Sequence, residues 1–393
     1  MNVTISPGPL HGTVHAIASK SVAHRILICS AFADRETILD CPETNDDIEA
    51  TASCLRSLGA TVIRTQTGYR VIPAEAIPQK ALLHCGESGS TLRFLLPVAG
   101  ALGVEATFRL AGRLPQRPLS PLWEEMERMG CTLSRPTEDT LLCRGKLRPG
   151  DYRIDPGISS QFVSGLLFAM ALTEGSSRLT LYGKAESQPY IAMTRDALSR
   201  FGVRTEDYAV TENHHLVSPG TVKVEGDWSN AAFFLAAKAL GNDLTVTNLN
   251  PGSAQGDRAV VDVLESLNAF SRIDAADIPD LVPVLAVAAG AKSGAEFRNI
   301  RRLRLKESDR VESVCAMIRS LGGRAESTEN TLTVYPTGYS GGTVDSAGDH
   351  RIAMSAAIAA TVATGPVTVL EAQCVRKSYP DFWNVYQQLG GKL

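Results

Sequence analysis

The chain repeats one pattern of secondary structure six times along its 393 residues, and this repetition limits its fold more than any other feature. Six amphipathic segments end in a Leu-Gly-like step, where Gly or Asn can take the left-handed conformation that ends a helix. They are CLRSLGA (54–60), EEMERMGC (124–131), ALSRFGV (197–203), VLESLNA (263–269), MIRSLGG (317–323) and YQQLGG (386–391). Such recurrence predicts six copies of one supersecondary unit.

A second kind of helical segment precedes each of these six. It opens on a small polar residue and continues with apolar residues on nearly every face, so these segments should form buried helices. They are SKSVAHRILICSAFA (19–33), SGSTLRFLLPVAGALG (88–103), SSQFVSGLLFAMAL (159–172), SNAAFFLAAKALG (229–241), PDLVPVLAVAAGA (279–291) and DHRIAMSAAIAATVATG (349–365). Each repeat therefore combines one buried helix with one surface helix.

The second repeat shows the complete order of elements. Runs typical of strands at 81–85 and 104–111 flank its buried helix, and two more at 131–135 and 140–144 surround the turn PTED. We read this order as βαβαββ. Six such units of about 65 residues predict an α/β (α+β) protein of two similar domains, each with three βαβαββ units and buried parallel helices.

The two ends of the chain indicate how the domains are connected. The last repeat stops at 390–393 without room for its hairpin, whereas NVTISP (2–7) is a strand without a repeat of its own. We therefore expect one discontinuous domain, residues 1–18 plus 225–393, with residues 19–224 inserted as the other. The two chain crossings would form a hinge. The fourth repeat should end in a short hairpin within AFSRIDAAD (269–277).

Charge and cysteine content argue against several classes of function. The 39 Lys plus Arg and 42 Asp plus Glu give a net charge of −3, which provides no general attraction to nucleic acid or to an anionic membrane. The 8 cysteines form no Cys-x-x-Cys pair, so a zinc site or a disulfide scaffold is not indicated and a reduced cytoplasm fits best. We expect no export signal in residues 1–10 and no membrane span, since the apolar stretch 281–291 is too short.

Polar residues gather at the starts of the buried helices. Lys20, Ser21 and Arg25 lie within two turns, and similar groups occur in GESGST (86–91) and SSQ (159–161). Helix N-termini present N–H groups and a partial positive charge, so such positions bind anions. The alternative for each is an ordinary capped helix with a solvated cation. No P-loop and no G-x-G-x-x-G fingerprint is present, so a nucleotide cofactor is not indicated.

The densest basic run is RRLRLKESDR (301–310), for which a nucleic-acid patch or a solvated face is the simplest interpretation. However, Asp309 with a Glu three residues later is typical of a helix start. This places Lys306 and Glu307 in the entering loop and Arg310 in the first turn. A carboxylate among cations suits acid–base chemistry, and a structural ion pair is the rival explanation.

Two further groups stand at helix starts. Asp280 precedes the apolar helix of the fifth repeat, and its local pattern predicts an N-cap. His350 in DHR (349–351) has no partner at a metal-ligand spacing, which favours a packing or hydrogen-bonding role over a ligand or a base. No G-x-S-x-G elbow occurs, which argues against a hydrolase triad.

The ordered combination of these motifs resembles the 5-enolpyruvylshikimate-3-phosphate synthase family. The motifs are SKSVAHR, GESGST, QRP, SSQF, SQPY, IPD, LRLKESDR, GDHRIAM and RKSYPDF, spread over residues 19–382. The resemblance implies the family's fold, two domains of three βαβαββ units. It also implies the family's reaction in aromatic amino acid biosynthesis, which moves the enolpyruvyl group of phosphoenolpyruvate to the 5-hydroxyl of shikimate 3-phosphate and releases phosphate without a metal or other cofactor.

Matched motif by motif, the resemblance implies roles for individual residues. Shikimate 3-phosphate would be bound by Lys20, Ser21, Arg25, Ser159, Ser160, Gln161, Ser187, Asp280 and Lys306. Phosphoenolpyruvate would be bound by Lys20, Gly89, Arg117, Gln161, Arg310, Arg351 and Lys377. Asp280 would accept the proton of the attacking hydroxyl, and Glu307 would protonate the methylene carbon. Lys20 and Lys377 would complete the catalytic set.

Two positions depart from the family's pattern. The usual Gly-Asn-[Ala/Ser]-Gly-Thr loop reads GESGST, so Glu87 brings a negative charge near the expected anion site. Arg302 stands where some relatives have a substrate-contacting Asn, and that contact is not transferred. In this interpretation the inserted domain carries most shikimate 3-phosphate contacts and the discontinuous domain carries the acid–base residues, and shikimate 3-phosphate draws the two domains together.

Two other functions use the same residues. A catalytically silent binding protein for phosphorylated sugar acids would keep the cations, and a nucleic-acid binder would use the run at 301–310. Retention of Asp280, Glu307 and Lys377 favours the enzyme, and no aromatic residues interleave the basic run. We expect a cytoplasmic monomer whose partners are small-molecule substrates, with neither nucleic acid nor a membrane bound.

Overall fold

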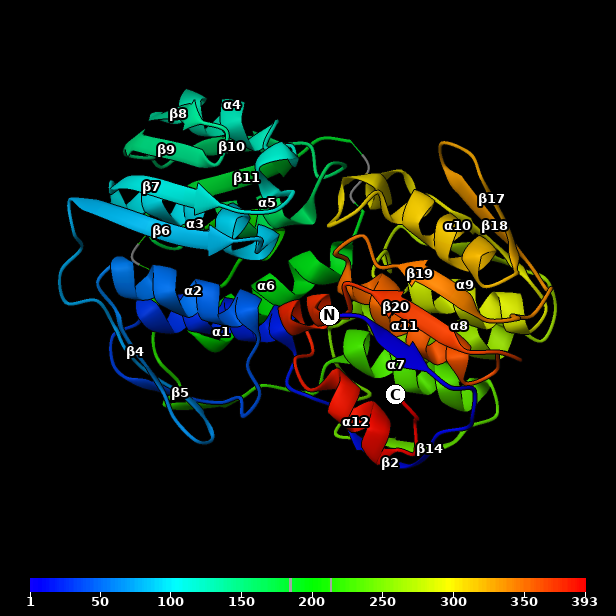
Figure 1. Ribbon diagram of the computed structural model, residues 1–393. Coiled ribbons are helices and arrows are strands. Elements are labelled where there is room, and N and C mark those ends of the chain that lie inside the picture. The colour runs from blue at the N-terminus through cyan, green and yellow to red at the C-terminus, as the bar shows by residue number, and fades with distance from the viewer. Residues whose placement is uncertain (184–185, 213) are drawn as a thin grey trace. The chain divides into compact units, whose positions relative to one another are not determined.

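The computed structural model describes residues 1–183, 186–212 and 214–393, and the chain folds into two compact units (Figure 1). Unit 1 consists of Met1–Ser19 and Glu225–Leu393, and unit 2 consists of Lys20–Val224. Unit 2 is therefore an insertion within unit 1, and the chain crosses between them twice. The sequence places the first crossing one residue earlier, after residue 18.

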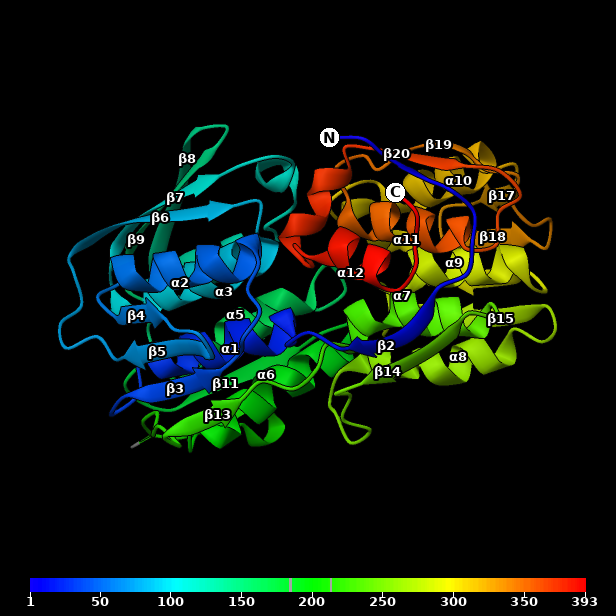
Figure 2. The same cartoon turned by 60° about the horizontal axis from the view of Figure 1, so that its bottom comes forward.

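In the described residues, unit 2 holds three small sheets, one for each of the first three repeats, and most of their strands are labelled in Figure 2. In sheet order the strands are β13 (Thr221–Lys223), β3 (Thr37–Asp40), β5 (Gly68–Ile72) and β4 (Thr61–Arg64); β6 (Lys80–Gly86), β7 (Glu105–Leu110), β9 (Thr140–Gly145) and β8 (Cys131–Thr137); and β10 (Asp151–Ile154), β11 (Ser177–Leu181) and β12 (Ala209–Val210). The buried helices are α1 (Lys20–Ala31), α3 (Gly89–Leu102) and α5 (Ser160–Met170), and the amphipathic helices are α2 (Asp46–Ser57), α4 (Leu122–Arg128) and α6 (Gln188–Arg200).

Unit 1 repeats this arrangement. Its sheets are β14 (Asp243–Thr247) with β2 (His11–His15); β15 (Ser271–Asp274), β16 (Ala295–Arg298), β18 (Thr331–Tyr335) and β17 (Arg324–Ser327); and β1 (Val3–Ile5), β20 (Val367–Leu370) and β19 (Gly342–Asp345). The buried helices are α7 (Trp228–Ala239), α9 (Val282–Ala291) and α11 (His350–Ala360), and the amphipathic helices are α8 (Val260–Ser266), α10 (Arg310–Ser320) and α12 (Phe382–Gln388). The expected fold class is confirmed.

The second and fifth repeats form complete βαβαββ sheets from contiguous chain. In each, the first two strands pair in parallel, and the last strand of the repeat pairs antiparallel with the second. The sheet orders are β6-β7-β9-β8 and β15-β16-β18-β17. Other repeats borrow a strand. β13 supplies the opening strand of the first sheet, and β1 pairs antiparallel with β20, so the N-terminal strand joins the last repeat as predicted.

The hairpin predicted within residues 269–277 is wrong. That segment contains the single strand β15, which pairs parallel with β16 and opens the fifth repeat. Because the run is short and polar, its sequence indicates a strand but not the strand with which it pairs. Pairing with β16 gives that repeat the same sheet order as the second one.

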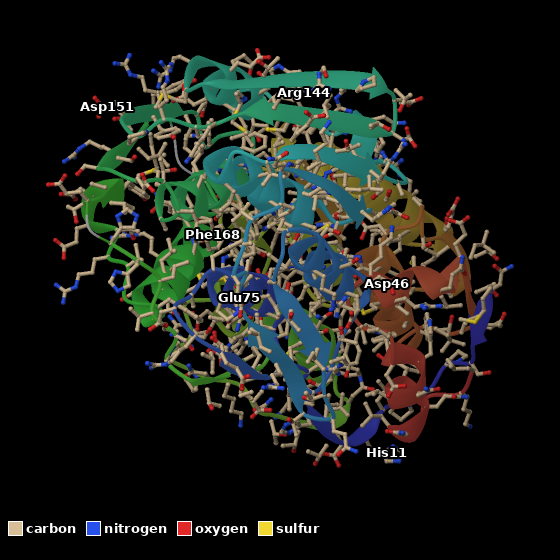
Figure 3. The ribbon with its side chains drawn as sticks, turned by 90° about the vertical axis from the view of Figure 1, so that its left-hand side faces the viewer. His11, Asp46, Glu75, Arg144, Asp151 and Phe168 are labelled. Atoms are coloured by element: carbon tan, nitrogen blue, oxygen red, sulfur yellow. The ribbon has the colours of Figure 1, made fainter. Side chains whose placement is uncertain are left out.

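The core of each unit is built from its three buried helices. α9 exposes little side-chain surface, with Val282–Gly290 buried throughout, and α3 is buried from Thr91 to Ala101. α3 packs against α5, and α9 packs against α11. Figure 3 shows Phe168 of α5 inside unit 2, whereas Arg144 of β9 points to the outside.

Glycine permits two features of this packing. Five of the helix-ending residues adopt positive φ, as the repeats predict: Gly59, Gly130, Gly202, Gly322 and Gly390. The sixth, Asn268, does not adopt positive φ. Within α5, a Cβ at Gly165 would overlap the carbonyl oxygen of Arg93 in α3. The closeness of α3 and α5 therefore depends on a residue without a side chain.

We predict that Gly165→Ala destabilises unit 2 by about 1–3 kcal/mol, the cost of overpacking a dense core. The added methyl group must push α5 away from α3. Gly8→Ala is the matched control, because a Cβ at Gly8 would meet no atom within 4 Å. Chemical denaturation of both variants checks this, and equal midpoints for the two would contradict the close helix contact.

Candidate active site

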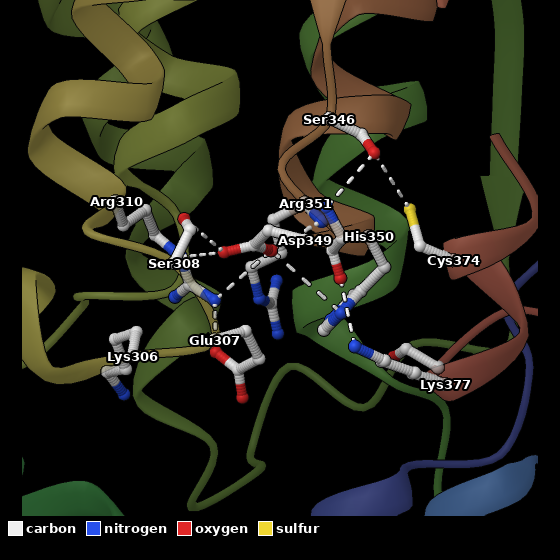
Figure 4. A network of polar contacts seen from close by, with 12 residues as sticks. Lys306, Glu307, Ser308, Arg310, Ser346, Asp349, His350, Arg351, Cys374 and Lys377 are labelled. Atoms are coloured by element: carbon white, nitrogen blue, oxygen red, sulfur yellow. Dashed lines mark hydrogen bonds and ion pairs between the residues drawn. The ribbon is translucent and has the colours of Figure 1, made fainter. Parts of the chain in front are cut away.

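A buried arginine joins three carboxylates in unit 1, and Figure 4 shows it with two of them, Glu307 and Asp349. The side chain of Arg310 is 1% exposed and lies in the first turn of α10. Its Nε donates to Asp349 Oδ2 at 2.9 Å, its Nη1 to Asp280 Oδ1 at 2.8 Å, and its Nη2 to Glu307 Oε2 at 2.7 Å. Burial lowers the pKa of Arg310, but attraction to Asp349, Glu307 and Asp280 outweighs it and raises the pKa above its ordinary value. We call these four residues the Arg310 cluster.

Asp280 forms ion pairs with two further cations. Lys306 Nζ lies 3.4 Å from Asp280 Oδ1, and Arg351 Nη2 lies 3.2 Å from Oδ2. Arg351 Nη1 also donates to the backbone carbonyl of Asp280 at 3.1 Å. Burial lowers the pKa of Lys306, and the charge of Arg310 lowers it further, against the attraction of Asp280. The carboxylate of Asp280 is thus held among three positive groups.

The prediction that Asp280 caps the following helix is wrong. α9 begins at Val282, its N-cap residue is Leu281, and no side chain caps it. A hydrogen bond between charged partners is stronger than one to a backbone N–H, so the Asp280 carboxylate turns to the guanidinium groups instead. The N-cap pattern is local, and it carries no information about Lys306 and Arg310, which lie about 30 residues later in the same repeat, or about Arg351 of the sixth repeat.

The loop before α10 holds the second carboxylate where the sequence predicts it. Asp309 caps α10 by accepting from Glu312 N at 3.2 Å, so Lys306 and Glu307 lie in the entering loop and Arg310 in the first turn. The side chain of Glu307 is 24% exposed. It is therefore close enough to solvent to exchange a proton and close enough to Arg310 to be stabilised as an anion.

Asp349 is a member of the cluster that sequence reasoning assigned no role. It is fully buried, caps α11 by accepting from Arg351 N at 2.9 Å, and accepts from Ser308 Oγ at 3.2 Å as well as from Arg310. The sequence could have indicated this role, because Asp349 directly precedes a buried helix, where an Asp side chain caps the helix and lies at its N-terminal end. Asp349 thus fixes Arg310 and the start of the Arg351 helix together.

Lys377 and His350 lie beside the cluster. Lys377 Nζ donates to the carbonyl of Gly348 at 2.9 Å, at the end of the 3-10 helix η5 (Ala372–Lys377). Cys374 Sγ in the same turn donates to Ser346 Oγ at 3.6 Å. His350 is buried at the first position of α11, as a packing residue would be, and its Nδ1 lies 3.9 Å from Asp349.

Asp257, in the 3-10 helix η3 (Gly256–Ala259), is a second carboxyl that the sequence did not single out. It is buried, and burial together with repulsion from Asp280 raises its pKa from 3.8 to about 6, against the opposing effects of the Arg351 charge and the Ser229 hydroxyl. No spacing in the sequence connects residue 257 with residue 280. Only the fold brings the two carboxyl groups into each other's field.

The basic run at 301–310 is part of this internal network. Arg302 Nη2 donates to the carbonyl of Ala276 at 2.9 Å, and Arg304 Nη1 lies 3.1 Å from Asp309 Oδ2. Together with Lys306 and Arg310, these cations are engaged by groups of their own unit. This internal pairing favours a structural role for Arg302 and Arg304 over a phosphate-binding stripe on the surface.

In unit 2, α1 positions the first cluster of candidate residues. Lys20 begins α1, and its Nζ lies 3.0 Å from Asp47 Oδ2 at the start of α2. Arg25 donates from Nε to Thr194 Oγ1 at 2.8 Å, from Nη1 to the carbonyl of Ser21 at 2.6 Å, and from Nη2 to that of Tyr190 at 2.9 Å. Burial lowers the pKa of Arg25 to about 10, so it remains a cation at neutral pH.

The start of α3 is shaped around an arginine. Ser88 caps the helix, and a Cβ at Gly89 would lie 2.7 Å from Arg117 Nη1. Arg117 therefore rests directly against the Gly89 backbone, as only glycine allows. Glu87, the departure from the family pattern, is exposed and turned to Gly112, where a Cβ would lie 2.5 Å from its Oε2.

The start of α5 presents the SSQ motif. Ser159 caps the helix by accepting from Gln161 N at 3.2 Å, and Ser160 is its first residue. The Gln161 amide is held at both ends: Oε1 accepts from Arg93 Nη1 at 2.9 Å, and Nε2 donates to Ser90 Oγ at 2.9 Å. Arg93, which the sequence reasoning missed, thereby ties α5 to α3.

Ser187 has an uncommon backbone. It is buried at the N-cap of α6 with φ of 53°, in the left-handed region that non-glycine residues avoid, and its hydroxyl does not cap the helix. Such strained positions cluster at ligand sites. Apart from Arg117, which follows the 3-10 helix η1 (Leu114–Gln116), the sequence-predicted residues of unit 2 therefore lie at or near the starts of α1, α3, α5 and α6.

Within the described ranges, no group of three or more His, Cys, Asp or Glu side chains could hold a metal ion, and no helix has the length and apolarity to span a membrane. The 8 cysteines are all free and buried. The candidate site is instead made of arginine, lysine, carboxylate and hydroxyl groups, which can bind anions and move protons.

Comparison with known proteins identifies relatives of the whole chain. Residues 5–272 and 267–386 match the family model for EPSP synthase (3-phosphoshikimate 1-carboxyvinyltransferase). The chain is 36% identical over 418 residues to the 3-phosphoshikimate 1-carboxyvinyltransferase of Clostridium kluyveri, covering 100% of this chain and 98% of the relative. It is 35% identical over 419 residues to that of Clostridium perfringens, covering 100% and 99%. A solved EPSP synthase from Acinetobacter baumannii has the same fold, with a TM-score of 0.79, 23% identity and coverage of 99% and 98%.

We predict that Asp257 makes stability depend on pH. Because its folded-state pKa is raised to about 6, its contribution is fully present below its ordinary pKa of 3.8 and is lost as the pH rises through about 6. The melting temperature of Asp257→Asn relative to that of the wild type should therefore be higher at about pH 8 than at about pH 5. The control is Asp243→Asn, an exposed site. Melting curves that shift in parallel at both pH values would contradict the prediction.

Proposed function

The chain belongs to the EPSP synthase family and transfers the enolpyruvyl group of phosphoenolpyruvate to shikimate 3-phosphate, and from this premise we propose how its residues divide the work. The relatives carry the name of a transferase, so the alternative of a silent binding protein has no support. The observation that carries the proposal is the Arg310 guanidinium, which holds Asp280 and Glu307 on its two Nη atoms. One buried cation thus sets two carboxylates side by side.

Asp280 accepts the proton of the 5-hydroxyl. Its carboxylate is surrounded by Arg310, Lys306 and Arg351, and these cations stabilise the charged form that a base requires. Glu307 donates a proton to the methylene carbon of phosphoenolpyruvate, and Arg310 stabilises the carboxylate that remains. In the elimination step the roles reverse, and phosphate leaves.

Unit 2 supplies most contacts to shikimate 3-phosphate. Ser159 and Ser160 at the start of α5, with Ser187 before α6, hold the phosphate where backbone N–H groups and helix dipoles favour an anion. Ser21 and Arg25 of α1 hold the rest of the molecule. The remaining assigned contacts are Lys20, Gln161, Asp280 and Lys306.

Phosphoenolpyruvate takes its contacts from both units. Lys20, Gly89 and Arg117, with Gln161, come from unit 2. Arg310, Arg351 and Lys377 come from unit 1. Lys20 and Lys377 complete the catalytic set by stabilising charge on the reacting molecule. Because the assigned residues are divided between the units, the proposal requires both units to act on one substrate pair, with closure driven by shikimate 3-phosphate.

The proposal includes a cytoplasmic monomer that needs no cofactor. Each assigned residue belongs to the same chain, and arginine and lysine supply the charge stabilisation that a metal would otherwise give. The free, buried cysteines suit a reducing compartment. A phosphate-release assay with both purified substrates tests the activity directly, since a binding protein would release none.

We predict that Glu307→Gln loses roughly 10²-fold or more in turnover, the scale of general acid catalysis. It should also slow solvent deuterium exchange into the phosphoenolpyruvate methylene group, because Gln cannot deliver the proton. Asp280→Ala should slow turnover while both substrates still bind. Glu312→Gln is the control, a nearby glutamate paired with Arg304 on the surface of α10. Normal methylene exchange in Glu307→Gln would make Glu307 an ion-pair residue and move the donor role to Lys20.

We predict that Gly89→Ala raises the KM for phosphoenolpyruvate by roughly tenfold or more, since a displaced binding group costs this much. The new methyl group would occupy the place of the Arg117 guanidinium. In an Arg117→Ala background the same substitution should cost little further, because its target is gone. Additive losses in the double variant would show that Gly89 acts without Arg117.

A further inference from the structure

The two chain segments that leave unit 1 for unit 2 are hydrogen-bonded to each other. Ser19 N donates to the carbonyl of Glu225 at 2.8 Å, and Asp227 N donates to that of Ile17 at 2.8 Å. Ala18 and Gly226 form an antiparallel bridge between them. Both crossings therefore leave unit 1 as one paired ribbon.

A buried glutamine amide binds this ribbon to the rest of unit 1. Gln255 is 6% exposed, and its Oε1 accepts from Ser19 Oγ and from Trp228 N, each at 3.1 Å. Its Nε2 donates to Glu225 Oε1 at 3.0 Å and to the carbonyl of Gly226 at 2.9 Å. Two acceptor and two donor positions are the full capacity of a glutamine amide. Three of the four bonds reach residues of the two crossings, and the fourth reaches Trp228, the first residue of α7.

Neighbours hold the same ribbon in place. Ser253 Oγ donates to Glu225 Oε1 at 2.6 Å and accepts from Gln255 N at 3.0 Å. Asn250 Nδ2 donates to Glu225 Oε2 at 3.0 Å. The Glu225 carboxylate therefore has three donors from one loop of unit 1, so a shift of the ribbon would leave a charged group with unsatisfied bonds.

On the other side, the crossings enter fixed elements at once. Lys20, directly after Ser19, is the first residue of α1, and Val224 N donates to the carbonyl of Asp40 in β3 at 2.9 Å. No free linker lies between Ser19 and Lys20. The placement of Lys20 therefore depends on how the ribbon is held one residue earlier.

Gln255 also belongs to the segment, residues 255–257, that lies near Asp280. Asp257 follows Gln255 by two residues and lies in the electrostatic field of Asp280 and Arg351. One short stretch of chain thus holds the ribbon at one end and borders the Arg310 cluster at the other. A displacement of Gln255 would therefore affect both the paired crossings and the surroundings of the Arg310 cluster.

We propose that Gln255 is a positioning residue, which fixes both chain crossings to unit 1 and thereby sets the placement of Lys20 for the reaction. The inference rests on the proposed role of Lys20. It predicts that disturbing Gln255 harms the steps that need both units and spares binding of shikimate 3-phosphate, most of whose assigned contacts lie in unit 2.

The test compares two buried amides of unit 1. Gln255→Glu keeps the shape and both acceptor bonds but replaces the Nε2 donor by an oxygen that faces the Glu225 carboxylate and the Gly226 carbonyl. Asn242→Asp is the control. Asn242 is also 6% exposed in unit 1 and bonds to Leu10, Ala237 and Thr361, away from the crossings. Both variants are measured for melting temperature, shikimate 3-phosphate affinity, steady-state kinetics and small-angle scattering with both substrates.

We expect Gln255→Glu to lower kcat/KM for phosphoenolpyruvate by roughly 10- to 100-fold, the effect of a small misplacement of catalytic groups. Affinity for shikimate 3-phosphate alone should stay near that of the wild type, and substrate-induced compaction should be reduced. Asn242→Asp should lose stability without these changes. If Gln255→Glu does not fold, Ser19→Ala, which removes one donor to Oε1, should show the same pattern more weakly.

Indistinguishable kinetics and compaction for Gln255→Glu and Asn242→Asp, or for Ser19→Ala and the wild type, would overturn the inference and leave Gln255 a structural residue. The proposed function is tested separately by the wild type. A wild-type chain that releases no phosphate from the two substrates fails at that step, whatever the Gln255 variants do.

Discussion

The buried guanidinium of Arg310 is the interaction on which the candidate site depends. A charge removed from water must be balanced by charges of opposite sign at hydrogen-bonding distance, and here the three carboxylates Asp280, Glu307 and Asp349 provide them. Each comes from the start of a different helix or from the loop before it. The need to neutralise Arg310 therefore gathers residues from separate parts of the chain, and the two carboxylates with partly exposed side chains, Asp280 and Glu307, are the ones left to meet a substrate.

The repeat explains why such residues are available. Every repeat buries an apolar helix, and the start of a buried helix must satisfy its N–H groups with polar residues that cannot sink further into the core. Ser88, Ser159, Asp227 and Asp349 cap four of these helices. The same positions offer a partial positive charge to an anion. A scaffold that only needed capped helices thus presents anion-binding groups in both units, and substrates with phosphate and carboxylate groups can use them.

Several features of the fold and the site could be read from the sequence because they depend on neighbours within one turn or one repeat. The apolar runs predict buried helices, and the Asp309 pattern predicts that α10 begins at Arg310. The errors arose where two local patterns look alike. An Asp before an apolar run can be a cap or an ion-pair partner, and Asp280 is the latter. The polar run at 269–277 can be a hairpin or a single strand, and it is a single strand.

By itself, the sequence determined the repeat, the fold class, the motif set that identifies the family, and which residues stand at helix starts. These follow from periodicity and short-range preference. Only the tertiary structure decided which of those residues meet: that Arg310 joins Asp280 to Asp349, that Arg117 rests on Gly89, and that Gln255 holds both crossings. The reason is physical. Ion pairs and buried hydrogen bonds act over a few ångströms in space, and residues brought that close by packing can be separated along the chain by any distance.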